Sequence, residues 1–428
     1  MENIINRSDE DFVILYKRED LQFRIYDNYS EEYSTGNYPL NRRTFHMFKG
    51  YELSDKGLKQ FAKAFYKWTT ELAELTLSKD ESKSIIDYSK VFSHQAMVTR
   101  VFNYFCKNKY KCHEQITPDE YKWFELSCNS SLQYLSPDAK GKIIDSYGYD
   151  QNKYYCRILG SELLIPINKG EEYKLKILDD KLRHGFYKVK ITCENEEFRK
   201  LFAFNKNHVY LNISIEFARK FQDKYDVNIE LIKDGKPNAL LYKDRDMRPL
   251  NSITKDWFNY LMNLNNNPIL KKNPLLKQIC STAWGALSET NTINKTLEEI
   301  NSENIDVGDE NHMYDIIDEV RGKNKHYYVL LNNWDPYKHN IRLKPWITSY
   351  GRNKIASLVL PYIDKVFRIH TDGIVLYESV TFLDQFMWPE EKTTGEIHWV
   401  HNNCYKHTSS LDYDEFVNKH VNKHTDTV

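Results

Sequence analysis

The chain has 428 residues, of which 41% are hydrophobic and 28% are charged, and its formal net charge at pH 7 is -1. This length allows two or three domains with a sizeable buried core, and the composition is that of a globular protein. No apolar run approaches the roughly 18 to 20 residues of a membrane-spanning helix, so no membrane partner is expected. The near-zero charge excludes a basic nucleic-acid footprint over the whole surface but allows a local basic groove.

The first residues of the chain and its cysteines indicate the cellular compartment of the protein. Residues 1–19 are charged and polar and lack the apolar core of a secretory signal. The seven cysteines are an odd number at irregular spacing, which favours reduced thiols. We therefore expect an intracellular protein.

The first half of the chain alternates between helical and strand patterns. Apolar residues at helical spacing predict a helix over 53–77, with one apolar side made by Leu58, Phe61, Phe65, Trp68 and Leu72. A second helix is predicted around 96–105, and turn signals over 114–140 lead into the next domain. Residues 142–150 are predicted as a strand that ends on an acid, 185–192 as a half-buried strand and 214–225 as an amphipathic helix.

The second half adds helices and two predicted hairpins. Residues 227–233 and 239–243 flank Asp234-Gly235-Lys236-Pro237, which predicts a hairpin connection. Helices are expected over 257–264, 274–288 and 348–364, a surface loop over the acidic stretch 296–325, and a hairpin over 366–378. The mixture predicts an α+β domain with an antiparallel sheet that begins near residue 140.

Two acids stand where strands end. Asp372 lies in a Thr-Asp-Gly turn, which a tight hairpin favours because Gly accepts a positive φ. It either only shapes the turn or presents a rigidly held carboxylate at the hairpin tip. Asp150 closes its strand just before a short predicted helix, either beside backbone N–H groups that bind phosphate oxygens or as the residue that caps the helix.

The predicted helix 273–288 carries a row of chemically distinct side chains. Asn273 suits its cap and Pro274 its first turn, and the buried stripe would contain Leu276, Ile279, Ala283 and Leu287. The other face would contain Lys277, Ser281, Trp284 and Ser288. This row would meet a triphosphate, a sugar and a base in turn, or else it is an ordinary surface face with Trp284 half packed.

In this order, the three segments resemble the polymerase motifs of family B DNA polymerases, closest to the protein-primed branch found in large DNA viruses and mobile elements. The matching stretches are 150–156, 277–285 and 368–373. The resemblance covers roughly residues 115–400. It implies an α+β, right-hand polymerase fold with an antiparallel-sheet palm and helical fingers. It also implies a truncated exonuclease-like N-terminus and a minimal thumb.

The resemblance also implies a domain layout. Residues 1–115 would be the exonuclease-like remnant with a helical linker, and 116–255 the first part of the palm with its catalytic acid. Residues 256–295 would form the fingers helices, 296–400 the second part of the palm, and 401–428 a short thumb-like tail. The location implied is the nucleus or a viral replication site in the host cytoplasm.

The activity implied is a DNA-directed DNA polymerase without proofreading. Asp150 and Asp372 would be the catalytic residues and hold two Mg²⁺ ions, for which Mn²⁺ could substitute. Tyr155 matches the aromatic residue that excludes a ribose 2′ hydroxyl. Lys277 matches the residue that contacts the triphosphate, Ser281 and Trp284 would line the nucleotide, and Arg352 would lie near DNA. The partners implied are primer-template DNA, deoxynucleoside triphosphates and a terminal priming protein.

Several departures from the family pattern leave an alternative open. His370 replaces the first Asp of the third motif; Lys153, Cys156, Ser281 and Gly373 replace Ser, Pro, Asn and Ser. The alternative is a degenerate palm that binds nucleic acid without catalysis. No Asp-x-Glu pair on a strand marks an exonuclease in residues 1–50. Asp55, four residues after Tyr51, resembles a Tyr-x-x-x-Asp motif or caps the helix that follows.

A final cluster has metal-ligating residue types. His398, His401, Cys404 and His407 recur at intervals of three. Zinc sites more often use C-x-x-C or H-x₃-H spacing, so a polar strand or helix face is the preferred interpretation and a zinc site the alternative.

Overall fold

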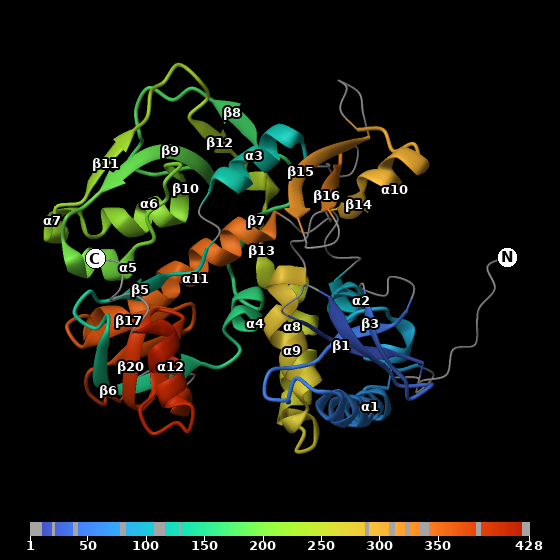
Figure 1. Cartoon of the computed structure of the whole chain (residues 1–428). Coiled ribbons are helices and arrows are strands. Elements are labelled where there is room, and N and C mark those ends of the chain that lie inside the picture. The colour runs from blue at the N-terminus through green and yellow to red at the C-terminus, as the bar shows by residue number, and fades with distance from the viewer. Residues whose placement is uncertain are drawn as a thin grey trace. The chain divides into compact units, whose positions relative to one another are not determined.

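The computed structural model describes residues 11–18, 22–36, 42–77, 83–106, 116–127, 130–286, 291–307, 313–321, 326–333, 342–381 and 387–421. Two compact units (Figure 1) each combine two stretches of chain: Met1–Lys111 with Ser252–Ile341, and Cys112–Asn251 with Arg342–Val428. Both mix helices with mainly antiparallel sheets, as predicted. The first unit includes residues 296–341, which were expected in the palm. Within the described ranges, no helix is long and apolar enough to cross a membrane.

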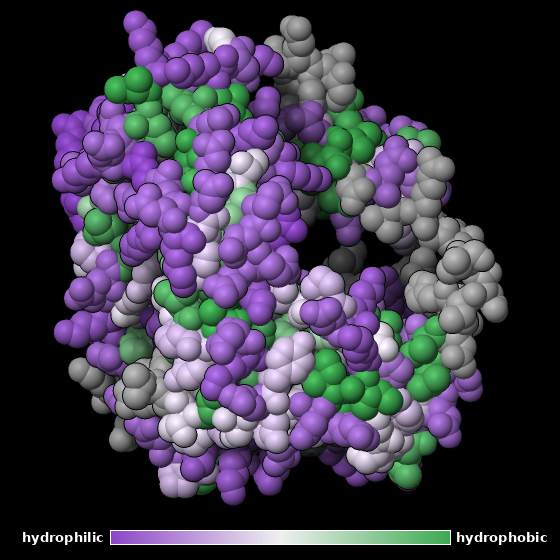
Figure 2. Space-filling model, turned by 90° about the vertical axis from the view of Figure 1, so that its left-hand side faces the viewer, coloured by the Kyte–Doolittle hydropathy of each residue, from purple (hydrophilic) through white to green (hydrophobic). Residues whose placement is uncertain are grey.

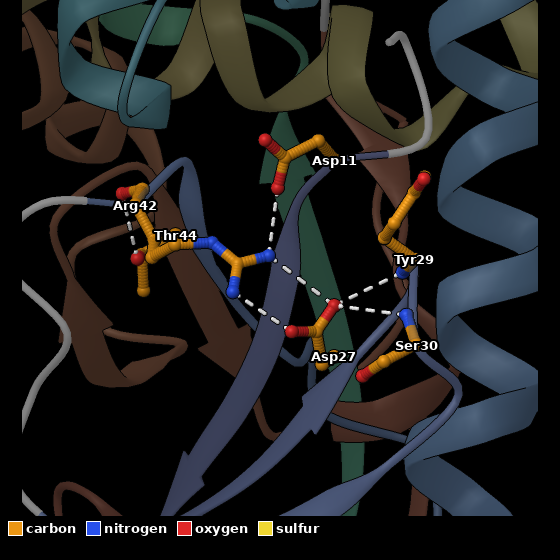
Figure 3. Close-up of polar contacts among 6 residues, drawn as sticks. All are labelled: Asp11, Asp27, Tyr29, Ser30, Arg42 and Thr44. Atoms are coloured by element: carbon orange, nitrogen blue, oxygen red, sulfur yellow. Dashed lines mark hydrogen bonds and ion pairs between the residues drawn. The ribbon is translucent and has the colours of Figure 1, made fainter. Parts of the chain in front are cut away.

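The first unit begins with a four-stranded sheet in the order β3-β2-β1-β4. Its strands are β1 (Val13–Lys17), β2 (Phe23–Asp27), β3 (Tyr33–Gly36) and β4 (Thr44–His46). Arg42 joins the start of β1 to the end of β2, because its guanidinium donates to Asp11 at 2.7 Å and to Asp27 at 2.8 Å (Figure 3). Asp27 also accepts the backbone N–H groups of Tyr29 and Ser30.

Helix α1 (Asp55–Leu75) confirms the predicted apolar periodicity. Leu58, Phe61, Phe65 and Leu72 are buried, while Trp68 is half-buried. The alternative in which Asp55 caps this helix is wrong: Ser54 is the cap and accepts from the Gly57 N–H. The Asp55 carboxylate instead accepts two hydrogen bonds from Arg24, at 2.7 and 2.6 Å.

Four further helical segments complete the core of the first unit. In Figure 1 the yellow α8 and α9 lie next to the blue N-terminal elements, and α9 packs against both α1 and α2. The segments are the 3₁₀ turn η1 (Tyr88–Lys90), α2 (His94–Cys106), α8 (Leu250–Asn266) and α9 (Pro274–Ala286), with a short η3 (Leu270–Lys272) between the last two. Leu250 and Asn251 of α8 fall in the second unit.

The loop predicted over 296–325 is wrong. This stretch contains α10 (Leu297–Ser302) and all of β15 (Tyr314–Arg321). Strand β15 pairs with β16 (His326–Asn332) in a sheet ordered β14-β16-β15, where β14 is Thr292–Thr296. Thr296 and Glu299 form a reciprocal capping box that starts α10. A β-bulge between Ile316 and Asp318 breaks the alternation of β15, so its strand pattern is hidden in the sequence.

The second unit is built around a seven-stranded sheet in the order β21-β20-β6-β18-β17-β5, in which β19 also pairs with β6. The long central strand β6 (Lys142–Gln151) and the hairpin of β17 (Val366–His370) and β18 (Gly373–Leu376) confirm two predictions. A buried cluster that includes Phe367, Val375 and Trp399 packs on the sheet. The remaining strands are β5 (Gln133–Leu135), β19 (Met387–Pro389), β20 (Gly395–His401) and β21 (Cys404–His407).

The helices of this unit include α11, which confirms the helix predicted before the hairpin. They are α3 (Pro118–Leu126), α4 (Tyr154–Leu159), α5 (Glu196–Leu201), α6 (Asn212–Arg219), α7 (Gln222–Tyr225), α11 (Leu343–Val359) and α12 (Tyr413–His420), with short 3₁₀ turns η2 (Asp244–Asp246), η4 (Leu360–Tyr362) and η5 (Glu391–Thr393). The single helix predicted over 214–225 is therefore two helices.

A second sheet of this unit shows that the hairpin predicted around Gly235 is wrong. Strands β11 (Asn228–Leu231) and β12 (Ala239–Leu241) do not pair with each other but follow one another along β9 (Gly185–Thr192). Asn238 fixes the loop between them by donating to the carbonyl groups of Leu175 and Ile232. The other strands are β8 (Glu171–Tyr173) and β10 (Val209–Leu211), and a separate pair joins β7 (Leu164–Pro166) to β13 (Met247–Pro249).

One ion pair lies entirely inside the second unit. Arg342, 0% exposed, donates to both oxygens of Glu120, 1% exposed, at 2.9 and 2.7 Å. The Tyr242 hydroxyl donates to the same carboxylate at 2.9 Å. Outside such buried contacts, hydrophilic residues predominate on the face shown in Figure 2 and hydrophobic ones form small groups, as is usual for a globular protein.

Candidate active site

The structure brings Asp150, on β6, next to Asp372, which lies in the turn between β17 and β18 of the second unit. Asp150 is the penultimate residue of β6 and lies opposite Gly373, the first residue of β18. The Gln151 N–H donates to the Asp372 carbonyl at 3.0 Å, which fixes the turn against the end of β6. A Cβ on Gly373 would stand 3.4 Å from Asp150 Oδ1. The two acids therefore share one end of the sheet.

The turn that presents Asp372 differs from the expected one. Thr371, not Gly373, has the positive φ, at 65°. Thr371 is held there because its N–H donates to the Leu132 carbonyl and its hydroxyl donates to Ser131 Oγ at 2.9 Å. Asp150 does not cap α4, since the cap position is Lys153. The alternative in which Asp150 caps the helix is therefore wrong, and for Asp372 both alternatives stay predictions.

Burial and the repulsion between the two carboxylates make Asp372 difficult to ionise. Burial, followed by the charge of Asp150, raises the pKa of Asp372 from 3.8 to about 7. The charge of Lys392 lowers the pKa of Asp372, and the charge of Glu390 raises it. A carboxyl group that ionises with such difficulty favours a bound cation, because the cation would offset the repulsion.

The raised pKa has a consequence for stability. In protein freed of metal by a chelator, the unfolded carboxyl group of Asp372 releases its proton near pH 4, whereas the folded one retains it to about pH 7. Stability should therefore fall as pH rises through this window. We expect Asp372→Asn, which lacks this titration, to gain thermal stability relative to the wild type between pH 4.5 and pH 8. Thermal unfolding at the two pH values measures this gain.

Asp145→Asn is the matched control for this measurement, because Asp145 is exposed on the same strand. It should leave the thermal stability close to that of the wild type. A stability difference between Asp372→Asn and the wild type that is equal at both pH values would contradict the proposed titration.

Two charged residues next to the acids were missed in the sequence. Glu390 forms an ion pair with Lys392 and accepts the Thr393 hydroxyl at 2.9 Å. Its N–H donates to the Gly148 carbonyl at 2.8 Å, so it is held beside β6. No local pattern pointed to these residues, because Glu390 precedes the 3₁₀ turn η5 (Glu391–Thr393) and Lys392 lies within it.

His370, the main departure from the family pattern, lies at the end of β17. Burial and then the charges of Arg368 and Lys392 lower its pKa below the usual 6.5. At neutral pH the ring is uncharged, so the site has a neutral group where the family has a carboxylate.

Tyr155 and Arg352 lie near the acid pair in the same unit. Tyr155, on α4, is 9% exposed, and burial followed by the charge of Asp372 raises its pKa to about 12. Arg352, on α11, is 7% exposed and donates to the Ser130 carbonyl at 2.6 Å and to Ser349 Oγ at 2.7 Å. These bonds give Arg352 a structural role; its contact with DNA stays a prediction.

The predicted row on α9 has the expected exposure. Lys277 and Ser281 are exposed and Trp284 is half-buried, whereas Leu276, Ile279 and Ala283 of the opposite stripe are buried. Leu287 and Ser288 lie outside the described residues. Because α9 belongs to the first unit, the roles of its three residues toward a nucleotide stay predictions.

The histidine and cysteine cluster falls on the β20–β21 hairpin. His398 shares a hydrogen bond of 2.9 Å with the Tyr413 hydroxyl, and His407 lies 3.2 Å from the Lys392 carbonyl. His401 pairs with Cys404 in the register of the two strands. Within the described ranges, no group of three or more His, Cys, Asp or Glu side chains is arranged to hold a metal ion.

The acid pair nevertheless has the donors that Mg²⁺ prefers. Mg²⁺ is commonly held by one or two carboxylates together with substrate phosphates and water. Asp150 and Asp372 supply two carboxylates at one end of the sheet, and the pKa of Asp372 is raised by burial and then by the charge of Asp150, a repulsion that a cation would offset. These residues therefore fit a site completed by substrate.

Comparison with known proteins gives a match in structure but none in sequence. No model of a protein family matches the chain, and no curated protein matches it. Phi29 DNA polymerase complexed with primer-template DNA matches with a TM-score of 0.53 and 13% identity, covering 86% of this chain and 62% of the polymerase. Its complex with primer-template DNA and incoming nucleotide substrates matches with a TM-score of 0.51 and 13% identity, covering 86% of this chain and 62% of the polymerase.

This likeness concerns the fold. The chain spans about three fifths of the length of the solved polymerase. Phi29 DNA polymerase is a protein-primed family B polymerase, so the resemblance inferred from the three motifs is confirmed at the level of fold.

Proposed function

We propose that the chain is a DNA-directed DNA polymerase that extends a primer 3′ end without proofreading. The observation that carries this proposal is the acid pair, Asp150 and Asp372, at the end of adjacent strands. It occurs in a fold shared with a polymerase that has been solved with primer-template DNA. The palm would then lie in the second unit, which contains both acids, and the fingers would include α8 and α9.

The reaction joins the primer 3′ oxygen to the α-phosphorus of a deoxynucleoside triphosphate and breaks the bond to the β-phosphate, releasing pyrophosphate. Asp150 and Asp372 would hold two Mg²⁺ ions, which when bound activate the 3′ hydroxyl and stabilise the leaving group. Tyr155, packed beside the acids, would exclude a ribose 2′ hydroxyl. On α9, Lys277 would contact the triphosphate, and Ser281 and Trp284 would line the sugar and base.

The test is extension of a labelled primer on a DNA template by the purified chain with Mg²⁺ and deoxynucleotides. A ladder of longer products that requires the template supports the proposal. Binding of the same DNA without any extension would favour the second candidate, a degenerate palm that only binds nucleic acid. The neutral ring of His370, in place of a carboxylate, is the observation that favours this second candidate.

His370→Asp should restore the missing carboxylate and accelerate Mg²⁺-supported extension by about tenfold, equivalent to about 1.4 kcal/mol of barrier. The physical reason is that added negative charge beside Asp372 strengthens cation binding. The wild type should depend more on Mn²⁺ than this variant does. Steady-state extension rates in each metal measure both effects.

His184→Asp, a change of the same kind at the residue before β9, is the control and should leave the rate unchanged. Equal rates for the wild type and His370→Asp would mean that His370 does not limit catalysis.

A further inference from the structure

Helix α9, with the predicted nucleotide-binding row, is anchored at its first turn to α1. Asn273, 2% exposed, donates to the Trp68 carbonyl at 3.0 Å and to Glu71 Oε2 at 3.1 Å. Its own side-chain oxygen accepts the Leu275 N–H at 3.0 Å. The start of α9 is therefore fixed to the N-terminal part of the same unit.

A second anchor acts in the middle of α9 and comes from the first residue of α2. His94 Nδ1 lies 2.8 Å from the Tyr88 hydroxyl, and His94 Nε2 lies 3.4 Å from Thr282 Oγ1 on α9. The ring also forms a hydrogen bond with the backbone of Gln278. Tyr88 is 1% exposed and packs edge-on against Phe45 and Phe65 in the core of the N-terminal sheet.

The partners of His94 define how its ring is protonated. Burial lowers the pKa of His94 to about 4, so the ring is neutral at neutral pH and has one N–H group. A carbonyl oxygen only accepts, so this N–H points toward Gln278 on α9. Nδ1 then accepts from the Tyr88 hydroxyl. A continuous set of hydrogen bonds thus runs from the N-terminal core to α9.

The Gln278 carbonyl connects the hydrogen bonds of His94 to the predicted row of Lys277, Ser281 and Trp284. It accepts the Thr282 hydroxyl at 2.8 Å and the Ser281 hydroxyl at 3.3 Å, in addition to the His94 ring. Ser281 is one of the three residues of the row. A change at His94 therefore alters the acceptor to which the Ser281 hydroxyl is bonded.

We propose that His94 is a positioning residue for the nucleotide-binding row of α9, an inference that rests on the function proposed above. The N-terminal sheet, predicted to belong to an exonuclease-like remnant, would then act as a support that orients Lys277, Ser281 and Trp284. His94 itself does not touch the nucleotide. It sets the rotation of α9 and the direction of the Ser281 hydroxyl through Gln278 and Thr282.

The experiment compares His94→Phe with the wild type in the full chain. Phe keeps a ring of similar size but cannot bond Tyr88 or Gln278. We expect the KM for deoxynucleotides to rise about fivefold with less than a twofold change in kcat, because ground-state positioning and not chemistry is lost. Hydrogen exchange of the amides in Pro274–Ala286 should become faster.

Two further variants separate this role from a general loss of stability. Tyr88→Phe removes only the hydroxyl that donates to His94 and should also raise the KM for deoxynucleotides. Tyr104→Phe, at an exposed position of α2, is the control and should leave this KM unchanged. Thr282→Ser keeps the hydroxyl and should retain the wild-type KM, whereas Thr282→Val should not.

The outcomes distinguish this inference from the proposed function. If the wild type extends primers but His94→Phe changes neither the nucleotide KM nor the exchange of α9, the inference is overturned. A lower kcat with an unchanged KM would also overturn it. If the wild type extends no primer, the proposed function fails, and faster exchange of α9 in His94→Phe would still establish the anchor itself.

Discussion

Asp372→Asn should abolish primer extension, with a loss of about 10³-fold or more, equivalent to about 4 kcal/mol of barrier. Asparagine keeps the size of the side chain at the turn but cannot supply the negative charge that a catalytic cation requires. Burial and the neighbouring Asp150 raise the pKa of Asp372 to about 7. A bound cation would oppose this shift, because it stabilises the ionised carboxylate. Single-turnover incorporation of one deoxynucleotide measures the loss.

The matched control is Asp145→Asn on the same strand, which should retain the wild-type rate because its side chain is exposed away from the acid pair. Asp150→Asn should behave like Asp372→Asn. Binding of primer-template DNA should be largely kept in both inactive variants. The backbone of Asp150 is held by the pairing of β6 with β18, and that of Asp372 by the hydrogen bond from the Gln151 N–H. Extension at the wild-type rate by Asp372→Asn would remove this residue from the proposed chemistry.

Glu120→Gln should destabilise the second unit by about 3 to 5 kcal/mol. The variant leaves the Arg342 guanidinium, 0% exposed, without a charged partner in a region that water does not reach. It also weakens the acceptor of the Tyr242 hydroxyl. Denaturant unfolding followed by circular dichroism measures the change in free energy.

Glu125→Gln, on the exposed side of the same helix α3, should change stability by less than about 0.5 kcal/mol. The double variant Glu120→Leu, Arg342→Met should recover part of the loss, because it removes both buried charges together. A loss below about 1 kcal/mol in Glu120→Gln would mean that the pair is not buried as described.

The sequence allowed the elements with strong periodicity to be predicted, and failed where long-range pairing decides the structure. The apolar side of α1 and the β17–β18 hairpin follow from local patterns. The turn sequence around Gly235 suggested a hairpin, but turn chemistry cannot show that β11 and β12 both pair with β9. In β15, the bulge at Ile316 hides the alternation on which strand prediction depends.

The two acids of the candidate site could be found from local sequence patterns, whereas the charged residues beside them could not. Asp150 and Asp372 each follow an apolar strand, so the sequence itself places them at strand ends. Glu390 and Lys392 come next to β6 only through the pairing of β19, which no local pattern predicts. The left-handed residue of the turn is Thr371, since contacts with Leu132 and Ser131 override the preference for Gly.

The most direct test of the central claim is single-nucleotide incorporation by the wild type against each of the four template bases, with binding of the same DNA measured in parallel. We expect the complementary deoxynucleotide to be added in each case and the corresponding ribonucleotide to be disfavoured. DNA binding without incorporation on any template would contradict the claim that Asp150 and Asp372 form a working polymerase site.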